Sequence, residues 1–182
     1  AVRVGGRLGC TSALADAGVF VVDSSFTHVH LDPLASRSRS PRDRFTPLTR
    51  ENRDGAEIHW MNLMDERDGS ESRIGLRDAL LQSLSCQSLW NSVATFDSAL
   101  RLRLVTPTDV AAVFARAPKH AQAVERLIDP RAESGPESIL RMIVRSAGFR
   151  CVPQVTIAGV GRVDLVVEDR LVLEADSRAW HG

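Results

Sequence analysis

The feature that most constrains the fold is a pair of apolar runs, residues 162–168 and 171–176, separated by Asp169 and Arg170. Two strand-like runs joined by so short a polar turn predict an antiparallel β-hairpin. Each run carries a carboxylate between apolar neighbours, Asp164 in the first and Glu174 in the second. The fold of this region therefore decides whether two acidic side chains meet.

The length of the hairpin loop settles that question. A loop with an odd number of residues, centred on Asp169, places Asp164 opposite Glu174, with Cβ atoms about 4.5–5.5 Å apart on one face. A two-residue turn places them on opposite faces, where they are unrelated. We favour the odd loop, because Asp169-Arg170 lacks the Asn-Gly or Gly-X sequence of two-residue turns. Two opposed carboxylates repel each other, and a hard divalent cation is the simplest group to offset that repulsion.

The remaining chain predicts an α+β protein. Leucines four residues apart, followed by an amphipathic spacing from Leu89 to Leu100, indicate that residues 73–128 are helical. Short strands are expected at residues 19–22, 27–31 and 58–61, and a short helix at 11–17. The polar segment 129–135 predicts a domain boundary, with an α+β region at 1–128 and a second region at 129–182. A helix at 136–147 and a strand at 151–157 then precede the hairpin.

Charge and hydropathy narrow the function classes. The net charge is zero and Lys119 is the only lysine, so contacts to phosphate depend on arginine. Six arginines against two acids lie within residues 36–53. This pattern indicates an exposed loop, either solvated or in contact with a phosphate backbone. No apolar run is long enough for a membrane span and no signal peptide is visible, which favours the cytoplasm.

Cysteine and histidine spacing does not predict a zinc site. Cys10, Cys86 and Cys151 lie far apart and are interpreted as small packing residues. His28 and His30 alternate on one strand, with His59 on a later one. Zinc needs three or four ligands, and no further ligand has a convincing spacing. A surface strand is therefore the preferred interpretation.

Glu137 has two interpretations. Its spacing from Ser134 is that of a capping box at the start of the helix at 136–147. A helix N-terminus aimed at the two carboxylates would also add Glu137 to a metal site and favour a bound phosphate. Downstream, Asp176 lies on the same strand face as Glu174, and His181 has the chemistry of a general acid or base or of a solvated histidine.

The segments Gly-Arg-Val-Asp-Leu-Val-Val (161–167) and Leu-Val-Leu-Glu-Ala-Asp-Ser-Arg-Ala-Trp-His-Gly (171–182) resemble a known family. It comprises actinobacterial proteins with a domain related to very-short-patch-repair (Vsr) endonucleases of the PD-(D/E)xK class, and includes AbiEi-like type IV toxin–antitoxin relatives. Residues 128–141 are similar to the family's lead-in, and Gln154-Val-Thr-Ile to its first core strand. The resemblance covers residues 129–182 and extends loosely over residues 5–104.

The resemblance implies a restriction-endonuclease-like α/β core that cleaves DNA with Mg²⁺ or Mn²⁺. Matched position by position, the metal ligands are Asp164, Glu174 and Glu137, with Asp176 or His181 orienting water. Three polar residues, Gln154, Arg162 and Arg178, are expected to contact nucleic acid. Asp176 stands where the class name has lysine. The family continues beyond His181-Gly182, so we expect an incomplete core.

Two hypotheses follow from the sequence. The first is a Mg²⁺-dependent DNA endonuclease or a domain derived from one, with turnover left open. The second is a non-catalytic DNA-binding or regulatory protein of the toxin–antitoxin type that keeps the nuclease scaffold. A homodimer and a toxin are the alternative protein partners.

Overall fold

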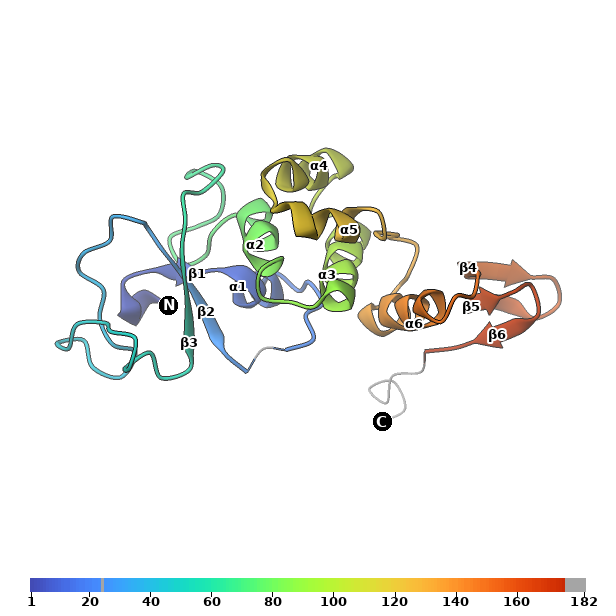
Figure 1. Ribbon diagram of the computed structural model, residues 1–182, viewed down its shortest axis with the longest axis horizontal. Helices are drawn as coiled ribbons and strands as arrows, with labels where there is room; N and C mark the ends of the chain where they lie inside the picture. Colours follow the sequence, from blue (N-terminus) through green and yellow to red (C-terminus); the bar gives the residue numbers. More distant parts are fainter. Residues whose placement is uncertain (24, 176–182) are drawn as a thin grey trace.

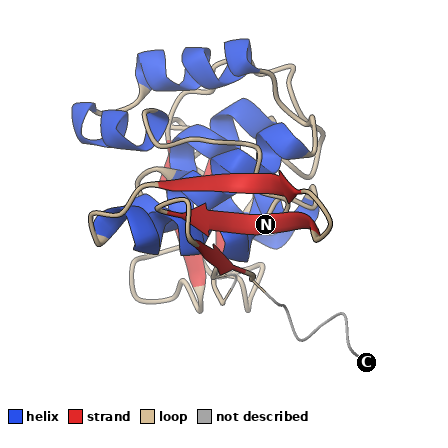
Figure 2. Cartoon of the chain, turned by 90° about the vertical axis from the view of Figure 1, so that its right-hand side faces the viewer, coloured by secondary structure: helices blue, strands red, loops and turns tan. Residues whose placement is uncertain are grey.

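The computed structural model describes residues 1–23 and 25–175. Two small three-stranded sheets lie toward opposite ends of an elongated arrangement, with most of the helices between them (Figure 1). This mixture of helices and sheets confirms the α+β class. Figure 2 looks along the chain from the C-terminal sheet, with the helices behind and around it.

The N-terminal sheet has the strand order β1-β2-β3. It contains β1 (Arg7–Leu8), β2 (Thr27–Leu31) and β3 (Ala56–Trp60), preceded by a 3₁₀ turn at Val2–Val4. β1 pairs with β2 antiparallel, and β2 pairs with β3 parallel. The strand expected at 27–31 is confirmed, and the next strand begins earlier than expected, at Ala56. In the parallel register His28 pairs with Glu57 and His30 with His59, so these four residues share one face.

The helical stretch expected at residues 73–128 is confirmed. It contains α2 (Leu76–Ser83), α3 (Leu89–Arg101), α4 (Pro107–Arg116), a 3₁₀ turn (Lys119–Ala121) and α5 (Gln122–Glu125). Thr106 and Asp109 form a complete capping box at the start of α4, and Pro107 occupies the first turn. The earlier helix α1 (Cys10–Asp16) begins one residue before its expected start.

The strand expected at residues 19–22 is wrong. Val19 is buried in the main hydrophobic core, and the backbone N–H of Phe20 donates to Ser98 Oγ of α3 at 2.9 Å. A Cβ on Gly135 would lie 2.1 Å from the ring of Phe20, so this ring packs against the glycine backbone. The segment therefore docks on helices, and its apolar residues fill helix surfaces instead of a sheet.

The main core joins the N-terminal elements to α6 (Gly135–Ser146), across the boundary expected at 129–135. Met142 of α6 is buried in the same cluster as residues of α1 to α5. Asp97 of α3 and Arg141 of α6 form an ion pair at 2.7 Å, and their side chains are 1% and 0% exposed. Asp97 also accepts from Ser138 Oγ, and Arg141 donates to the backbone oxygen of Leu127. Polar and apolar contacts together therefore hold α6 against α3.

The C-terminal sheet is an antiparallel meander of β4 (Cys151–Ile157), β5 (Gly161–Val167) and β6 (Leu171–Leu173). Val144 of α6 packs on its inner face with Cys151, Leu165 and Val167. The helix thus faces the main core and this sheet at once. Its N-cap is Ser134, which accepts from the N–H of Glu137 at 3.3 Å.

The hairpin loop has the odd length that the turn chemistry predicted. Leu165 pairs with Leu173 and Val167 with Leu171, which leaves a three-residue loop centred on Asp169. Glu168 and Asp169 both have positive φ, 47° and 56°. One step along this register from the Leu165–Leu173 pair places Asp164 opposite Glu174. The two carboxylates therefore come from facing positions.

Residues 36–53 form the loop that their composition indicated, with a single bridge between Arg39 and Pro47. Part of its charge is paired, since Arg42 Nε lies 2.8 Å from Asp54 Oδ1. Across residues 1–23 and 25–175, we find no helix with the length and apolar character that a membrane crossing requires.

Candidate functional site

One candidate site lies where the N-terminus of α6 meets the C-terminal sheet, and Glu137 and Gln154 are in contact there. Glu137 lies in the first turn of α6, and its Oε2 accepts from the backbone N–H of Glu133 at 2.7 Å. The same oxygen accepts from Gln154 Nε2 of β4 at 2.8 Å. The glutamate therefore stabilises the turn before the helix and also reaches the sheet. The capping and the site interpretations of Glu137 are compatible.

Asp164 joins the site from β5. Its Oδ1 lies 3.3 Å from Gln154 Nε2, and its Oδ2 accepts from the backbone N–H of Ala175 at 2.9 Å. The backbone N–H of Asp164 donates in turn to Glu174 Oε2 at 3.4 Å. Four of the residues matched by resemblance, Glu137, Gln154, Asp164 and Glu174, thus form one continuous polar chain of contacts.

The backbone of Gln154 is unusual for a residue inside a strand. Its φ is 55°, in the left-handed region that residues other than glycine rarely adopt. Pro153 and Val155 on either side keep their pairing with Leu165 and Val163. Such strain persists only where the surroundings hold it, and it concentrates at functional sites. Here it accompanies an amide group that reaches two carboxylates from two different elements.

The amide nitrogen of Gln154 stands where the sequence suggested a cation. It lies between Glu137 and Asp164 and can give one N–H to each, while backbone N–H groups serve Asp164 and Glu174. Donors of the chain itself therefore offset part of the carboxylate repulsion. A divalent cation, the simplest candidate from the sequence, is therefore not the sole group that can offset this repulsion.

Arg162 lies one residue before Val163 on the edge of the same site. Its Nη2 contacts Glu133 Oε2 at 2.6 Å, and its side chain is 55% exposed. Arg101 of α3 contacts the other oxygen of Glu133 at 2.7 Å. Glu133 therefore holds two guanidinium groups near the first turn of α6. The expected site residues Asp176, Arg178 and His181 lie outside the described residues.

A second group of side chains meets near the N-terminal sheet, and sequence spacing missed it. Cys10, His28, His59 and Cys86 each offer one ligand atom, and these atoms all lie within 4.8 Å of one another. This group could hold a metal ion, and it contains no carboxylate. The interpretation of the cysteines as small packing residues is confirmed for Cys10 and Cys151, which are buried, and is wrong for Cys86, which is exposed. The interpretation of the histidines as a surface strand is wrong, because His28 is buried and His30 is 3% exposed. In the sequence, the alternation of His28 and His30 on one strand was the pattern that could have indicated this group.

Comparison with known proteins gives no relative. No family model, curated protein or solved structure matches the chain. A function can therefore be inferred only from the geometry of the two sites and from the resemblance in the sequence.

Proposed function

We propose that α6 and the β4–β6 sheet form the core of a Mg²⁺-dependent DNA endonuclease, or of a domain derived from one. The observation that carries this proposal is that the amide of Gln154 contacts both Glu137 and Asp164, and that Glu174 accepts from the backbone N–H of Asp164. These residues come from a helix N-terminus and two strands, and the similarity to very-short-patch-repair endonucleases singled out the same positions.

The donor set suits a hard divalent cation. Carboxylate and amide oxygens are the ligands that Mg²⁺ prefers, and the site offers three carboxylates and one amide. An ion bound by both Glu137 and Asp164 must replace the amide nitrogen of Gln154, which lies 2.8 Å from one and 3.3 Å from the other. A turn of this amide would release both oxygens. When bound, the cation would activate water and neutralise charge on a phosphodiester.

Other residues of the chain would position the nucleic acid. The half-exposed guanidinium of Arg162 matches a phosphate in shape and charge, and it can exchange Glu133 for that phosphate. The N-terminus of α6 favours an anion in the same region. This proposal includes contact with DNA, and a homodimer or a toxin as the protein partner. It also includes a cytoplasmic location, where the three free cysteines would stay reduced.

The second candidate function is a non-catalytic DNA-binding or regulatory protein of the toxin–antitoxin type. One observation favours it: the amide of Gln154 and three backbone N–H groups already donate to the carboxylates. With N–H donors of the chain on these carboxylates, a nuclease scaffold needs no ion to be stable. The two candidates differ in metal binding and in turnover, and both can be measured.

Calorimetric titration with Mg²⁺ and Mn²⁺ is the first test. We expect wild type to bind the metal ion and Asp164→Ala to lose this binding. Asp164 is one of the proposed ligands, and it lies between Gln154 and the backbone N–H of Ala175. Asp169→Asn is the matched control. It removes one carboxylate from the loop of the same hairpin, and asparagine tolerates its φ of 56°. If wild type and Asp164→Ala bind equally, the carboxylates do not form the metal site.

Nicking of a supercoiled plasmid then separates the two functions. The endonuclease proposal predicts cleavage with Mg²⁺ or Mn²⁺ that Asp164→Ala and Glu174→Gln abolish and Asp169→Asn retains. Metal binding without nicking by wild type would support a domain derived from an endonuclease. A gel shift of DNA with neither metal binding nor nicking would instead support the regulatory function.

A further inference from the structure

Four segments that are distant in the sequence deliver the cysteines and histidines of the N-terminal group. Cys10 is the first residue of α1, and Cys86 follows the end of α2. His28 lies on β2 and His59 on β3, on the same face of the parallel pair. The group therefore joins both helices to the two long strands of the N-terminal sheet.

The four ligand atoms lie close enough together to surround one ion, since all are within 4.8 Å of one another. His28 Nδ1 lies 3.0 Å from His59 Nε2, and Cys86 Sγ lies 3.7 Å from that same nitrogen. With Zn–N bonds of about 2.0–2.1 Å and Zn–S bonds of about 2.3 Å, ligands of one tetrahedral zinc lie about 3.3–3.8 Å apart. The two closest contacts need shifts of a few tenths of an ångström to reach that geometry, and separations of up to 4.8 Å need shifts of about 1 Å.

The backbones that carry the ligands are fixed by further polar contacts. Cys10 has a φ of 48°, and its N–H donates to Gln82 Oε1 at 2.9 Å. Gln82 Nε2 lies 3.0 Å from His30 Nδ1, and the N–H of His28 donates to Ser12 Oγ at 2.9 Å. Partners of this kind orient metal ligands, and their presence here indicates a site already arranged for an ion.

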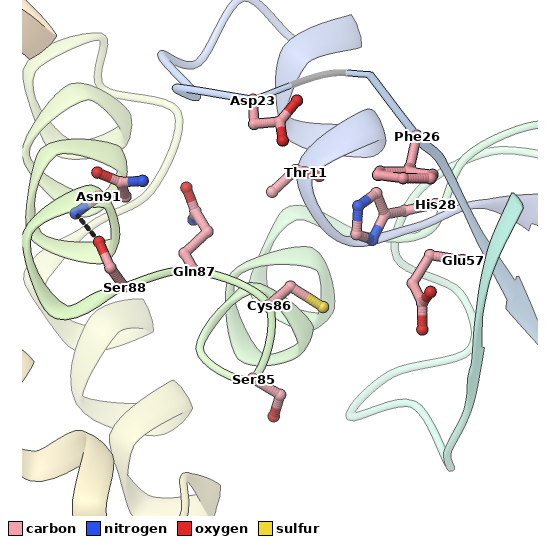
Figure 3. A pocket seen from close by; sticks show the side chains of 10 residues that line it. All are labelled: Thr11, Asp23, Phe26, His28, Glu57, Ser85, Cys86, Gln87, Ser88 and Asn91. Carbon is pink, nitrogen blue, oxygen red and sulfur yellow. Dashed lines mark hydrogen bonds between the residues drawn. The ribbon is translucent and has the colours of Figure 1, made fainter. Parts of the chain in front are cut away.

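The chemistry of the donors selects the metal. Two sulfurs and two imidazole nitrogens suit zinc, whereas magnesium and calcium require oxygen ligands. His28 and Cys86 also line a pocket of about 450 Å³, in which the sulfur of Cys86 is directed toward His28 (Figure 3).

We propose that Cys10, His28, His59 and Cys86 bind one Zn²⁺ ion as a closed, structural site. Four protein ligands complete a tetrahedral shell, which leaves no open position for a substrate. The ion ties α1 and the end of α2 to β2 and β3. Its role is to stabilise the N-terminal part of the fold, independently of the carboxylate site at the other end of the chain.

The test measures zinc bound to the whole protein. Protein purified under reducing conditions and incubated with Zn²⁺ is desalted, and its zinc content is determined by mass spectrometry. We expect about one zinc per chain for wild type and a loss of most of it in Cys86→Ser and His59→Ala. Cys151→Ala and His120→Ala are the matched controls, because Cys151 lies in the C-terminal sheet and His120 is exposed on a 3₁₀ turn. Both controls should keep the zinc.

Cobalt substitution identifies the ligands in wild type, so the test does not depend on variants that fold. Co²⁺ in this site should give the intense visible absorption of a tetrahedral complex and the charge-transfer band of bound thiolates. Asp164→Ala should give the same spectrum, which separates this site from the carboxylate site. Three results would each overturn the proposal: no zinc above background in wild type, an octahedral cobalt spectrum, or a Cys10–Cys86 disulfide that forms in place of metal binding.

Discussion

A single residue, Gln154, shows how backbone strain and site chemistry meet in this protein. Its φ of 55° lies in the middle of β4, where an L side chain is disfavoured, and its amide reaches two carboxylates. The left-handed conformation costs about 1–3 kcal/mol, whereas each hydrogen bond to a charged group contributes about 1.5–3 kcal/mol. The two amide contacts are therefore sufficient to hold the strained backbone.

Two substitutions at Gln154 separate the strain from the hydrogen bonds. Gln154→Ala and Gln154→Gly both remove the side-chain amide, but only glycine accepts a φ of 55° without a steric penalty. We expect Gln154→Gly to be more stable than Gln154→Ala by about 1 kcal/mol. Urea unfolding of the two variants measures the difference. A clearly more stable alanine variant would show that the backbone at this position is not left-handed.

Elements differ in how far their local sequence determines them. The Ser134 cap of α6 and the odd loop between β5 and β6 were both predicted, because each depends on residues next to one another in the chain. The strand expected at residues 19–22 failed for the opposite reason. Its valines are equally suited to a strand and to a helix surface, and packing against Ser98 and Gly135 decides between them.

The capping box of α4 gives a pH prediction. Hydrogen bonds from the side chain and backbone of Thr106 lower the pKa of Asp109 below its usual 3.8. A lowered carboxyl pKa contributes stability above the unfolded value and loses it as the pH falls through the folded value. We therefore expect Asp109→Ala to be less stable than wild type by about 0.5–1 kcal/mol at pH 7, with the difference shrinking toward pH 3.

Urea unfolding at several pH values measures this difference. Asp109→Asn is the control, since its amide keeps an acceptor for Thr106 but does not titrate. A gap between wild type and Asp109→Ala that stays constant with pH would mean that the charge of Asp109 contributes nothing.

At the scale of the whole molecule, the two sites differ in how much the sequence could reveal. Three carboxylates were identified because a hairpin register and a helix start determine where they lie, and Gln154 was identified from the family resemblance. The four ligands of the N-terminal group come from separate segments, and only the parallel pairing of β2 with β3 and the packing of α1 on α2 unite them. Such long-range pairing leaves no local spacing, so the cysteines looked unrelated.

The buried pair of Asp97 and Arg141 connects the two parts of the molecule, because it fixes the helix that carries Glu137 to the main core. Among the described residues, Asp97→Leu leaves the buried Arg141 side chain with the backbone oxygen of Leu127 as its one hydrogen-bond partner, and should destabilise the protein by about 3–5 kcal/mol. The double variant Asp97→Leu/Arg141→Met replaces both charges with apolar groups, so we expect it to be more stable than Asp97→Leu alone. Urea unfolding of wild type, both single variants and the double variant measures this coupling. Simple additivity of the two single losses would show that the pair does not hold α6 in place, since independent residues add and coupled ones do not.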